Sequence, residues 1–416
     1  MNSVDVIIVG GGAAGMFAAA VLAEEAPEMK VLVLEKGARP LAKVRVSGGG
    51  RCNLTHQCSD IREFVKNYPR GGRELIGPFH RFGPAETVEW FESHGVPLAT
   101  LDDGCLFPKS DTSEDVINVL LKTATAEIRT NSEVSKVWKF DGGFNVKLAN
   151  GKQLSCKKLL VATGGGAFIE GLGHTIEPCV PSLFTFNTSD KEFTARAGIV
   201  VEDVCVSAGK LKAEGALLIT HTGVSGPAVL RLSSFGARTL AETNYRFEMK
   251  INWLPSMSEE QIFQTLEKQR TISPRKQVGT WSPLGLSSRL WKLLVARAGV
   301  DETREWGGCS TKALRQLAAQ VSSFILPIIG KNKHREEFVT CGGIRLKEVN
   351  FHPTKGREAE QMRGNDRREC QTLESRLVPG LYFAGEVLDI DALTGGFNLQ
   401  AAWTTGYLAA QAIILG

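Results

Sequence analysis

The chain has 416 residues and a mass of 45.1 kDa, which at about 150 residues per domain predicts two or three domains. Its 43% hydrophobic and 23% charged residues are typical of a globular protein with a sizeable core, and they exclude a mainly disordered chain. The formal charge of +4 is small for this length and no run of Lys or Arg occurs, so we expect no nucleic-acid partner.

Nine cysteines, an odd number without any CxxC pair, argue against a disulfide framework or a structural zinc site and predict a reducing, cytoplasmic location. Residues 6–23 are uncharged and mostly apolar, which is close to the length of a membrane span. Four glycines interrupt this stretch, Asp5 precedes it, and no basic residue stands before it. We therefore predict a strand, a turn and a helix there, and no membrane association.

The first elements form a strand–helix–strand unit. Residues 4–9 read as a buried strand, the GGGAAG stretch opens a helix that runs to about residue 26, and residues 31–35 form a second strand. The glycine-rich residues 46–56 predict a loop. Beyond it, the pattern predicts helices near 84–94 and 113–127 and strands at 132–140, 144–149 and 157–162.

The middle of the chain changes character twice. Residues 183–253 alternate like strands with little helical periodicity, which predicts a small antiparallel sheet or barrel. From Pro255 the pattern is helical: Ser258 and Gln261 form a capping box, Ser310 is a candidate helix N-cap, and Gly299 stands where a helix would end. Short strands return at 338–346 and 381–385, and an Ala-rich helix spans about 398–415. The highly charged segment 354–372 predicts a solvated loop, with a docking segment for a partner as the alternative.

A dinucleotide-binding motif follows the first strand. Gly10, Gly12 and Gly15 spell GxGxxG into a helix, and Glu35 ends the next strand. Glycines at these positions permit a tight turn, backbone approach to a pyrophosphate and close helix–strand packing, while Glu35 would accept hydrogen bonds from ribose. Ala13, Ala14 and Lys36 belong to the same predicted site. The motif alone leaves NAD and FAD open.

Two later segments favour FAD. One strand ends in Ala162, Thr163 and Gly164, and another is followed by Gly385 and Glu386, whose carboxylate could hold ribityl hydroxyls. A helix that starts near Asn398 after Gly396 and Phe397 would direct its positive end at the flavin ring. The alternative is that Glu386, Asp389 and Asp391 serve only as turn and capping residues.

A family resemblance rests on blocks that follow one another along almost the whole chain. VIIVGGGAAG, KVRVSGGGRCNLTH, LFPKSDTSEDVINVLL, LGHTIEPCVPSLFTF, LLITHTGVSGPAVLRLS, VTCGGIRLKEV and TLESRLVPGLYFAGEVLDIDALTGGFNLQAAW resemble the HI0933-like flavoprotein family, also called BaiN-type or aminoacetone-oxidase-like FAD oxidoreductases. The resemblance implies noncovalent FAD. It also implies that a group of residues beyond the nucleotide motif contacts this cofactor: Arg45, Ser47, Gly48, Gly49, Gly50, Arg51, Cys52, Asn53, Val134, Gly396, Phe397, Asn398, Leu399 and Gln400. Asp391 is a further candidate for cofactor binding.

The implied fold is α/β: a glutathione-reductase-type, Rossmann-like FAD-binding domain with an inserted β-barrel-like domain and a small helical subdomain. We place the first part of the FAD-binding domain at 1–182, the β-rich insertion at 183–254, the helical subdomain at 255–337 and the return part at 338–416. The sequence departs from the family where it passes quickly from Gly166 to LGHTI and at the charged segment 354–372. Neither departure touches the FAD motifs.

The predicted function is hydride transfer through flavin N5 to a small organic substrate. No second GxGxxG occurs, so NAD(P)H, if it is the electron donor, would bind only transiently over the flavin. Three other functions remain as alternatives: an oxygen-using amine or aminoketone oxidase, a flavin-binding RNA-modifying protein and a non-catalytic nucleotide-binding scaffold. His221 is a candidate proton donor or a structural hydrogen-bonding residue. Cys52 is a candidate for a redox-active pair with Cys58, and the alternative is that it is a packed thiol. No histidine has the spacing of a metal ligand, so no metal is expected. The oligomeric state is left open.

Overall fold

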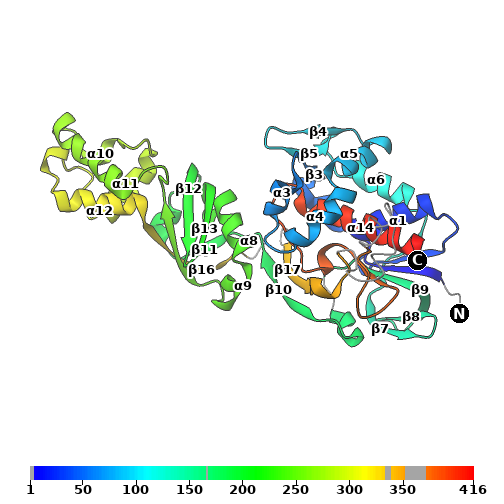
Figure 1. Ribbon diagram of the computed structural model, residues 1–416. Coiled ribbons are helices and arrows are strands. Elements are labelled where there is room, and N and C mark those ends of the chain that lie inside the picture. The colour runs from blue at the N-terminus through cyan, green and yellow to red at the C-terminus, as the bar shows by residue number, and fades with distance from the viewer. Residues whose placement is uncertain (1–3, 165–166, 333–338, 352–371) are drawn as a thin grey trace, which may run out of the picture. The chain divides into compact units, whose positions relative to one another are not determined.

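The computed structural model describes residues 4–164, 167–332, 339–351 and 372–416, and the chain divides into two compact units (Figure 1). Unit 1 comprises residues 1–180 and 339–416, and unit 2 comprises residues 181–338. The predicted charged segment 354–372 lies outside the described residues except for Thr372.

Unit 1 is built on a seven-stranded sheet in which β6, β2, β1, β9, β8 and β7 follow one another and β18 also pairs with β9. Pairing is parallel between neighbouring strands among β6, β2, β1, β9 and β18. In contrast, β7 and β8 form an antiparallel hairpin, and β8 also pairs antiparallel with β9. The sheet strands are β1 (Val4–Val9), β2 (Val31–Leu34), β6 (Glu127–Arg129), β7 (Val134–Phe140), β8 (Gly143–Leu148), β9 (Gln153–Val161) and β18 (Leu381–Phe383).

Two helices that are apolar on nearly every side lie next to each other on this sheet. They are α1 (Ala13–Glu25) and α14 (Phe397–Leu415), and Figure 1 shows their ribbons side by side. Gly406 permits the close contact, because a Cβ there would lie 2.5 Å from the Ala14 carbonyl oxygen. Burial on both sides explains why neither helix shows an amphipathic pattern in the sequence.

The rest of unit 1 contains short elements, several of which the sequence patterns did not predict. The helices are α2 (Ala42–Val46), α3 (Ile61–Phe64), α4 (Gly72–Arg81), α5 (Pro84–Ser93) and α6 (Glu114–Thr123), and a small sheet consists of β3 (Thr55–His56), β5 (Cys105–Pro108) and β4 (Leu98–Thr100). The predicted helix 113–127 ends at Thr123, because Glu127–Arg129 leaves it to become edge strand β6 beside β2. The predicted loop 46–56 contains four 3-10 residues, Ser47–Gly50, and ends in β3.

Unit 2 contains a closed six-stranded barrel, as the β-rich pattern predicts, in the order β11, β14, β13, β12, β15 and β16. Its strands are β11 (Phe186–Thr188), β12 (Val200–Ala208), β13 (Leu211–Ile219), β14 (Gly223–Ser225), β15 (Phe247–Asn252) and β16 (Phe324–Lys331). The strand β16 differs from the prediction of a helical segment over 255–337: it pairs with β15 and β11 and closes the barrel.

Helices pack around this barrel. Besides the one-turn α7 (Lys191–Thr194), the helices are α8 (Pro227–Phe235), α9 (Ala237–Glu242), α10 (Glu259–Ile272), α11 (Ser288–Arg297) and α12 (Thr311–Ser322). In Figure 1, α10, α11 and α12 group together within the unit, apart from α8 and α9. The α8–α9 pair corrects the expectation that 183–253 holds little helix. Pro227 begins α8 after Gly226, and one side of α8 packs against β13.

The helix-capping signals of unit 2 are confirmed. Ser258 Oγ accepts from Gln261 N–H at 3.3 Å, and Gln261 Oε1 accepts from Ser258 N–H at 2.8 Å, which completes the capping box of α10. Ser310 Oγ accepts from Ala313 N–H at the start of α12, and Gly299, which follows the C-cap residue of α11, takes a φ of +71°. These caps show that local chemistry alone fixes several helix ends.

The chain passes between the units through β10 (Ile176–Ser182) and β17 (Val339–Ile344), which pair with each other. Just before β10, His174 is buried beside Ser375 at an Nε2–Oγ distance of 2.8 Å. Ser375 Oγ already accepts the N–H groups of Leu377 and Val378, so its O–H donates to His174 Nε2. The imidazole proton therefore lies on Nδ1, which has no partner among the described residues.

This buried imidazole predicts an acid-sensitive fold. Burial lowers the pKa of His174 below its usual value, so the unfolded chain binds this proton more readily than the folded protein. The contribution of His174 to stability is complete above its unfolded pKa of about 6.5 and is lost as pH falls below that value. We expect His174→Gln, whose side-chain oxygen can accept from Ser375, to make the free energy of unfolding less pH-dependent between about pH 7 and 5. Urea titrations of both proteins across this range measure the difference; parallel pH profiles would contradict it.

Among the helices of the described residues, none combines the length and hydropathy that crossing a membrane requires.

Candidate cofactor site at the carboxyl edge of the sheet

The predicted cofactor-binding residues all lie in unit 1, and many of them follow its parallel strands. Val9 is opposite both Leu34 and Val161, and Phe383 is opposite Val161, so β1, β2, β9 and β18 end together. The loops that follow them contain Gly10 to Gly15, Glu35 and Lys36, Ala162 to Gly164, and Gly385 with Glu386. This carboxyl edge is where open parallel sheets bind ligands.

The glycine motif has the three steric features that a nucleotide loop needs. Gly10 has a φ of +111°, and a Cβ there would lie 2.5 Å from the Ala162 carbonyl oxygen. A Cβ on Gly15 would lie 2.0 Å from the Gly10 oxygen, so glycine is required for α1 to pack on β1. A Cβ on Gly12 would meet no atom within 4 Å, so its glycine is not needed for packing. Gly12 is the N-cap of α1, whose first turn has no acidic residue to oppose an anion.

Glu35 is fixed beside this loop by backbone amides. Its Oε2 accepts from Gly11 N–H at 2.8 Å and its Oε1 from Gly37 N–H at 2.7 Å, and each oxygen has a further lone pair for a ribose hydroxyl. Ser132 N–H donates to the Glu35 carbonyl at 2.8 Å, which brings the segment before Val134 and β7 to the same edge. Lys36 is exposed beside it.

Two family blocks that are far apart in the sequence pack against each other. Gly396, with a φ of +86°, caps α14, and a Cβ there would lie 2.5 Å from the Thr55 carbonyl carbon. With its amide oriented toward these groups, Asn53 accepts from Gly396 N–H at 3.2 Å and donates to the Thr55 oxygen at 3.0 Å. The His56 ring stacks on Phe397 at a centroid distance of 4.9 Å. The N-terminus of α14 therefore lies against the GGGRCNLTH segment, and its first turn has no acidic residue.

The α2 helix brings charged groups to this segment. The Arg45 guanidinium pairs with Glu114, yet its Nε is buried and has no hydrogen-bond partner among the described residues. Ser47 Oγ donates to the Val44 oxygen, and Gly48, Gly49 and Gly50 all have positive φ. The Arg51 guanidinium lies 4.4 Å from the Phe107 ring centroid. An unpartnered buried Nε, a positively charged helix end and a glycine loop that admits a bulky group together fit an anionic dinucleotide such as FAD.

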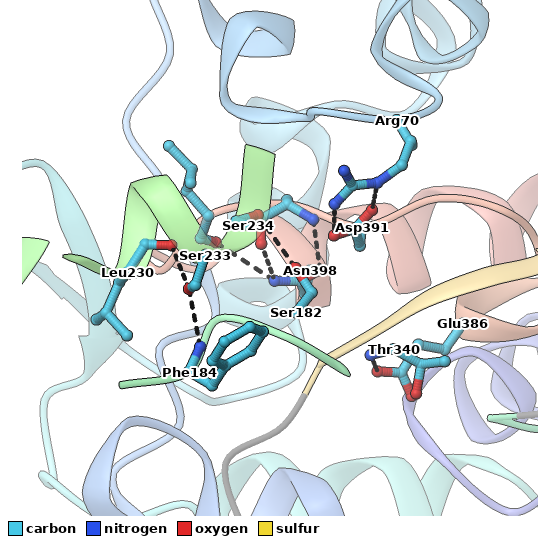
Figure 2. A network of polar contacts seen from close by, with 12 residues as sticks. Arg70, Ser182, Phe184, Leu230, Ser233, Ser234, Thr340, Glu386, Asp391 and Asn398 are labelled. Atoms are coloured by element: carbon cyan, nitrogen blue, oxygen red, sulfur yellow. Dashed lines mark hydrogen bonds and ion pairs between the residues drawn. The ribbon is translucent and has the colours of Figure 1, made fainter. Parts of the chain in front are cut away.

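Lys43 is a site residue that the sequence did not reveal. Its Nζ lies 2.5 Å from Glu386 Oε2, and the other Glu386 oxygen accepts from Thr340 N–H at 3.3 Å (Figure 2). A Cβ on Gly164 would lie 3.2 Å from Glu386 Oε2 and 3.6 Å from Lys43 Nζ. The two charged side chains thus meet beside the end of β9, although 343 residues separate them.

Three predicted side chains are engaged within the protein. Asp391 is fully buried and pairs with Arg70 (Figure 2). Gln400 bonds to the hydroxyls of Thr55, Thr87 and Thr404, and Asn398 bonds to the backbone of Ala392 and Leu393. A cofactor contact from Asn398 or Leu399 would therefore come most directly from the backbone N–H groups of the first turn of α14, whereas Gln400 N–H already donates to the Gly396 oxygen at 2.9 Å.

Cys52 has the environment of a packed thiol rather than a redox centre. It is fully buried, its backbone has a φ of +62°, and burial raises the pKa of its thiol to about 12. Cys52 and Cys58 are both free thiols. Little thiolate therefore exists at neutral pH, and thiolate is the reactive form.

We expect Cys52→Ala to retain FAD and the wild-type rate of flavin reduction, because the buried thiol performs no chemistry. The small loss of packing should lower the free energy of unfolding by about 1 kcal/mol. Anaerobic stopped-flow absorbance measures flavin reduction, and Cys58→Ala serves as the matched control. A tenfold slower reduction in Cys52→Ala alone would restore the redox hypothesis.

His221 lies in unit 2, exposed between β13 and β14. Its role as a proton donor stays a prediction. In the part of the chain that the structure describes, no three His, Cys, Asp or Glu side chains gather as metal ligands. A cavity of about 690 Å³ lies at the amino edge of the sheet, where Val4, Val31 and Glu127 begin their strands, opposite the edge described above.

Comparison with known proteins agrees with this geometry. The model of the HI0933-like protein Rossmann domain matches residues 4–362 and 366–412. The chain is 29% identical to the ribosomal RNA dihydrouridine synthase of Escherichia coli K12 over 100% of this chain and 99% of that protein. It is also 29% identical to the 3-dehydro-bile acid delta(4,6)-reductase of Clostridium scindens over 97% of this chain and 98% of that protein.

Among solved structures, 3-ketosteroid delta1-dehydrogenase from Sterolibacterium denitrificans covers 100% of both chains with a TM-score of 0.50 and 12% identity, which supports the fold alone. The predicted fold class, with a Rossmann-type FAD-binding domain and an inserted barrel, is confirmed. The chain belongs to the HI0933-like family and is an FAD-dependent oxidoreductase.

Proposed function

We propose that this protein uses NAD(P)H to reduce a carbon–carbon double bond that is conjugated to a carbonyl group. The observation that carries the proposal is the match to two relatives over nearly their whole length. Dihydrouridine forms when the uracil C5–C6 double bond, conjugated to the C4 carbonyl, gains two hydrogens. The 4,6 double bonds of a 3-oxo bile acid are likewise conjugated to a ketone. The two named activities therefore share one reaction on very different molecules.

The reaction balances as one hydride and one proton added across the double bond, while NAD(P)H is oxidised to NAD(P)⁺. Bound FAD supplies the hydride at its N5 atom. The residues that would hold it are the Gly10–Gly15 loop and Glu35 at the nucleotide end, Arg45 near the phosphates, and Glu386 with the first turn of α14 toward the flavin.

The protein's own groups contribute electrostatics and position. The first-turn N–H groups of α14 concentrate partial positive charge, which would stabilise the negative charge of a reduced ring bound at this helix end. The Lys43–Glu386 ion pair holds both side chains at the end of β9 and adds no net charge there. His221 is proposed as the donor of the proton that completes the product.

An anaerobic spectroscopic titration tests the proposal. NADH or NADPH should bleach the flavin bands of the purified protein, and a cyclic enone such as cyclohex-2-enone or a uridine-containing RNA should restore them without oxygen. A flavin that is bleached by amines or aminoketones and not by NAD(P)H would instead establish the oxidase alternative. A flavin that NAD(P)H bleaches and neither acceptor reoxidises would refute reduction of a conjugated double bond.

A further inference from the structure

We infer that unit 2 carries an RNA-binding surface on two paired loops, residues 273–281 and 301–309, named here the basic loop pair. The inference rests on the proposed function and narrows its substrate to uridine within RNA. It reverses the expectation, drawn from the charge of the whole chain, that no nucleic acid is bound.

Backbone hydrogen bonds hold the basic loop pair together. Val278 N–H donates to the Arg304 oxygen at 2.8 Å, Trp306 N–H to the Lys276 oxygen at 2.9 Å, and Gly307 N–H to the Pro274 oxygen at 2.9 Å. Beneath the loops, Trp291 Nε1 donates to the Val278 oxygen at 2.7 Å. The surface is therefore a fixed part of the fold, joined to the buried core of α11.

The positive charge of the protein is concentrated in this part of the chain. Residues 255–323 contain ten Lys and Arg against six Asp and Glu, a formal charge of +4 that equals the charge of the whole chain. Unit 2 has 21 Lys and Arg against 15 Asp and Glu, or +6, which leaves −2 for unit 1. The small formal charge of the whole chain is therefore the sum of a positive charge on unit 2 and a negative charge on unit 1.

Several basic residues outside the basic loop pair form ion pairs, whereas most basic residues on the basic loop pair or next to it do not. Arg297 pairs with Asp190 and Glu192, Arg315 with Glu260, and Lys292 with Glu302. In contrast, a set of exposed basic residues on or next to the basic loop pair has no ion pair within the described residues: Lys268, Arg275, Lys276, Arg304 and Lys312.

The acidic residues of these loops do not cancel this charge. Asp301 accepts hydrogen bonds from Thr303, Glu302 pairs with Lys292, and Glu305 is the remaining carboxylate. Arg270 donates to Thr311 at 3.2 Å, which holds the start of α12, and with it Lys312, beside the end of α10. The unpaired charges therefore lie on neighbouring segments and favour a polyanion.

Exposed apolar side chains next to the charges suit nucleic acid in particular. Trp281 is 55% exposed, whereas Trp291 and Trp306 of the same subdomain are buried. An exposed indole ring on the same loop as Arg275 and Lys276 offers a stacking platform for a base while the cations contact phosphates. Ile272, 68% exposed at the end of α10, adds an apolar contact. Acidic side chains would satisfy the charges but have no flat ring to stack on the indole, whereas every nucleotide combines a phosphate with a base.

The test measures binding of a fluorescein-labelled, uridine-containing RNA stem-loop to the FAD-loaded full-length protein by fluorescence anisotropy. We expect Arg275→Glu/Lys276→Glu to weaken binding at least about tenfold and to lower the slope of log K against log salt by about 2, because two phosphate contacts are lost. Trp281→Ala should weaken binding about fivefold or more without changing the salt slope. The matched control is Lys210→Glu/Lys250→Glu, which makes the same charge change at exposed positions on the barrel.

Equal weakening by the control pair, no weakening by the loop variants, or displacement of the RNA by polyglutamate at equal charge concentration would each overturn the inference. Anaerobic reduction of cyclohex-2-enone, measured on the same samples, separates this result from the proposed function. Loss of RNA binding with unchanged enone reduction supports the surface. A wild-type protein that reduces the enone and does not bind RNA refutes the surface and leaves the proposed function intact.

Discussion

Gly12→Val is expected to produce a folded protein without bound FAD. The Gly12 Cβ position has no neighbour within 4 Å, and the Gly12 backbone is extended, so valine fits the apoprotein. The same side chain would occupy the approach of the pyrophosphate to the N-terminus of α1. Two charge-assisted hydrogen bonds lost at about 1.5 kcal/mol each would weaken FAD binding by about 100-fold. Flavin absorbance per mole of purified protein and reconstitution titrations measure this effect.

Gly15→Ala is the matched control for Gly12→Val. Its Cβ would lie 2.0 Å from the Gly10 oxygen, so α1 would have to move away from β1. We expect a loss of about 3 kcal/mol in the free energy of unfolding, whereas Gly12→Val should cost at most about 1 kcal/mol. Wild-type flavin content in Gly12→Val would show that the cofactor site has been assigned incorrectly.

Arg70→Met should be the most destabilising of the single substitutions away from the cofactor site. Asp391 is fully buried, and its carboxylate pairs with the largely buried Arg70 guanidinium. Removing one partner leaves a buried charge without its counterion, which costs about 3–5 kcal/mol. The loop that precedes Gly396 and α14 should loosen as well, since Arg70 and Asp391 also form a backbone bridge. Urea unfolding followed by tryptophan fluorescence gives the magnitude.

The double variant Arg70→Met/Asp391→Leu separates charge burial from packing. Replacing both partners by apolar residues removes the uncompensated charge, so most of the lost stability should return. A double variant as unstable as Arg70→Met would show that shape, rather than charge, is responsible.

The two apolar runs and the glycine turn within residues 4–35 were sufficient to predict β1, α1 and β2, because buried parallel strands and tight glycine turns leave strong local signals. The capping box at Ser258 is equally local. In contrast, β16 had a short apolar sequence inside a helical region, and only its pairing with β15 and β11 made it a strand. The net charge of +4 likewise gave no indication that unit 2 carries +6, because a sum over the chain ignores where the charges lie.

The sequence by itself therefore determined the dinucleotide motif, the fold class and the family, since each depends on residues close together in the chain or on blocks in a fixed order. The tertiary structure alone decided that Lys43 meets Glu386, that Asp391 pairs with Arg70 and that Gln400 bonds to Thr55. These partners are more than 300 residues apart, and their contacts arise because the parallel strands end at one edge and α14 returns across it. A side chain's role at such an edge is set by its neighbours in space, and no local pattern encodes them.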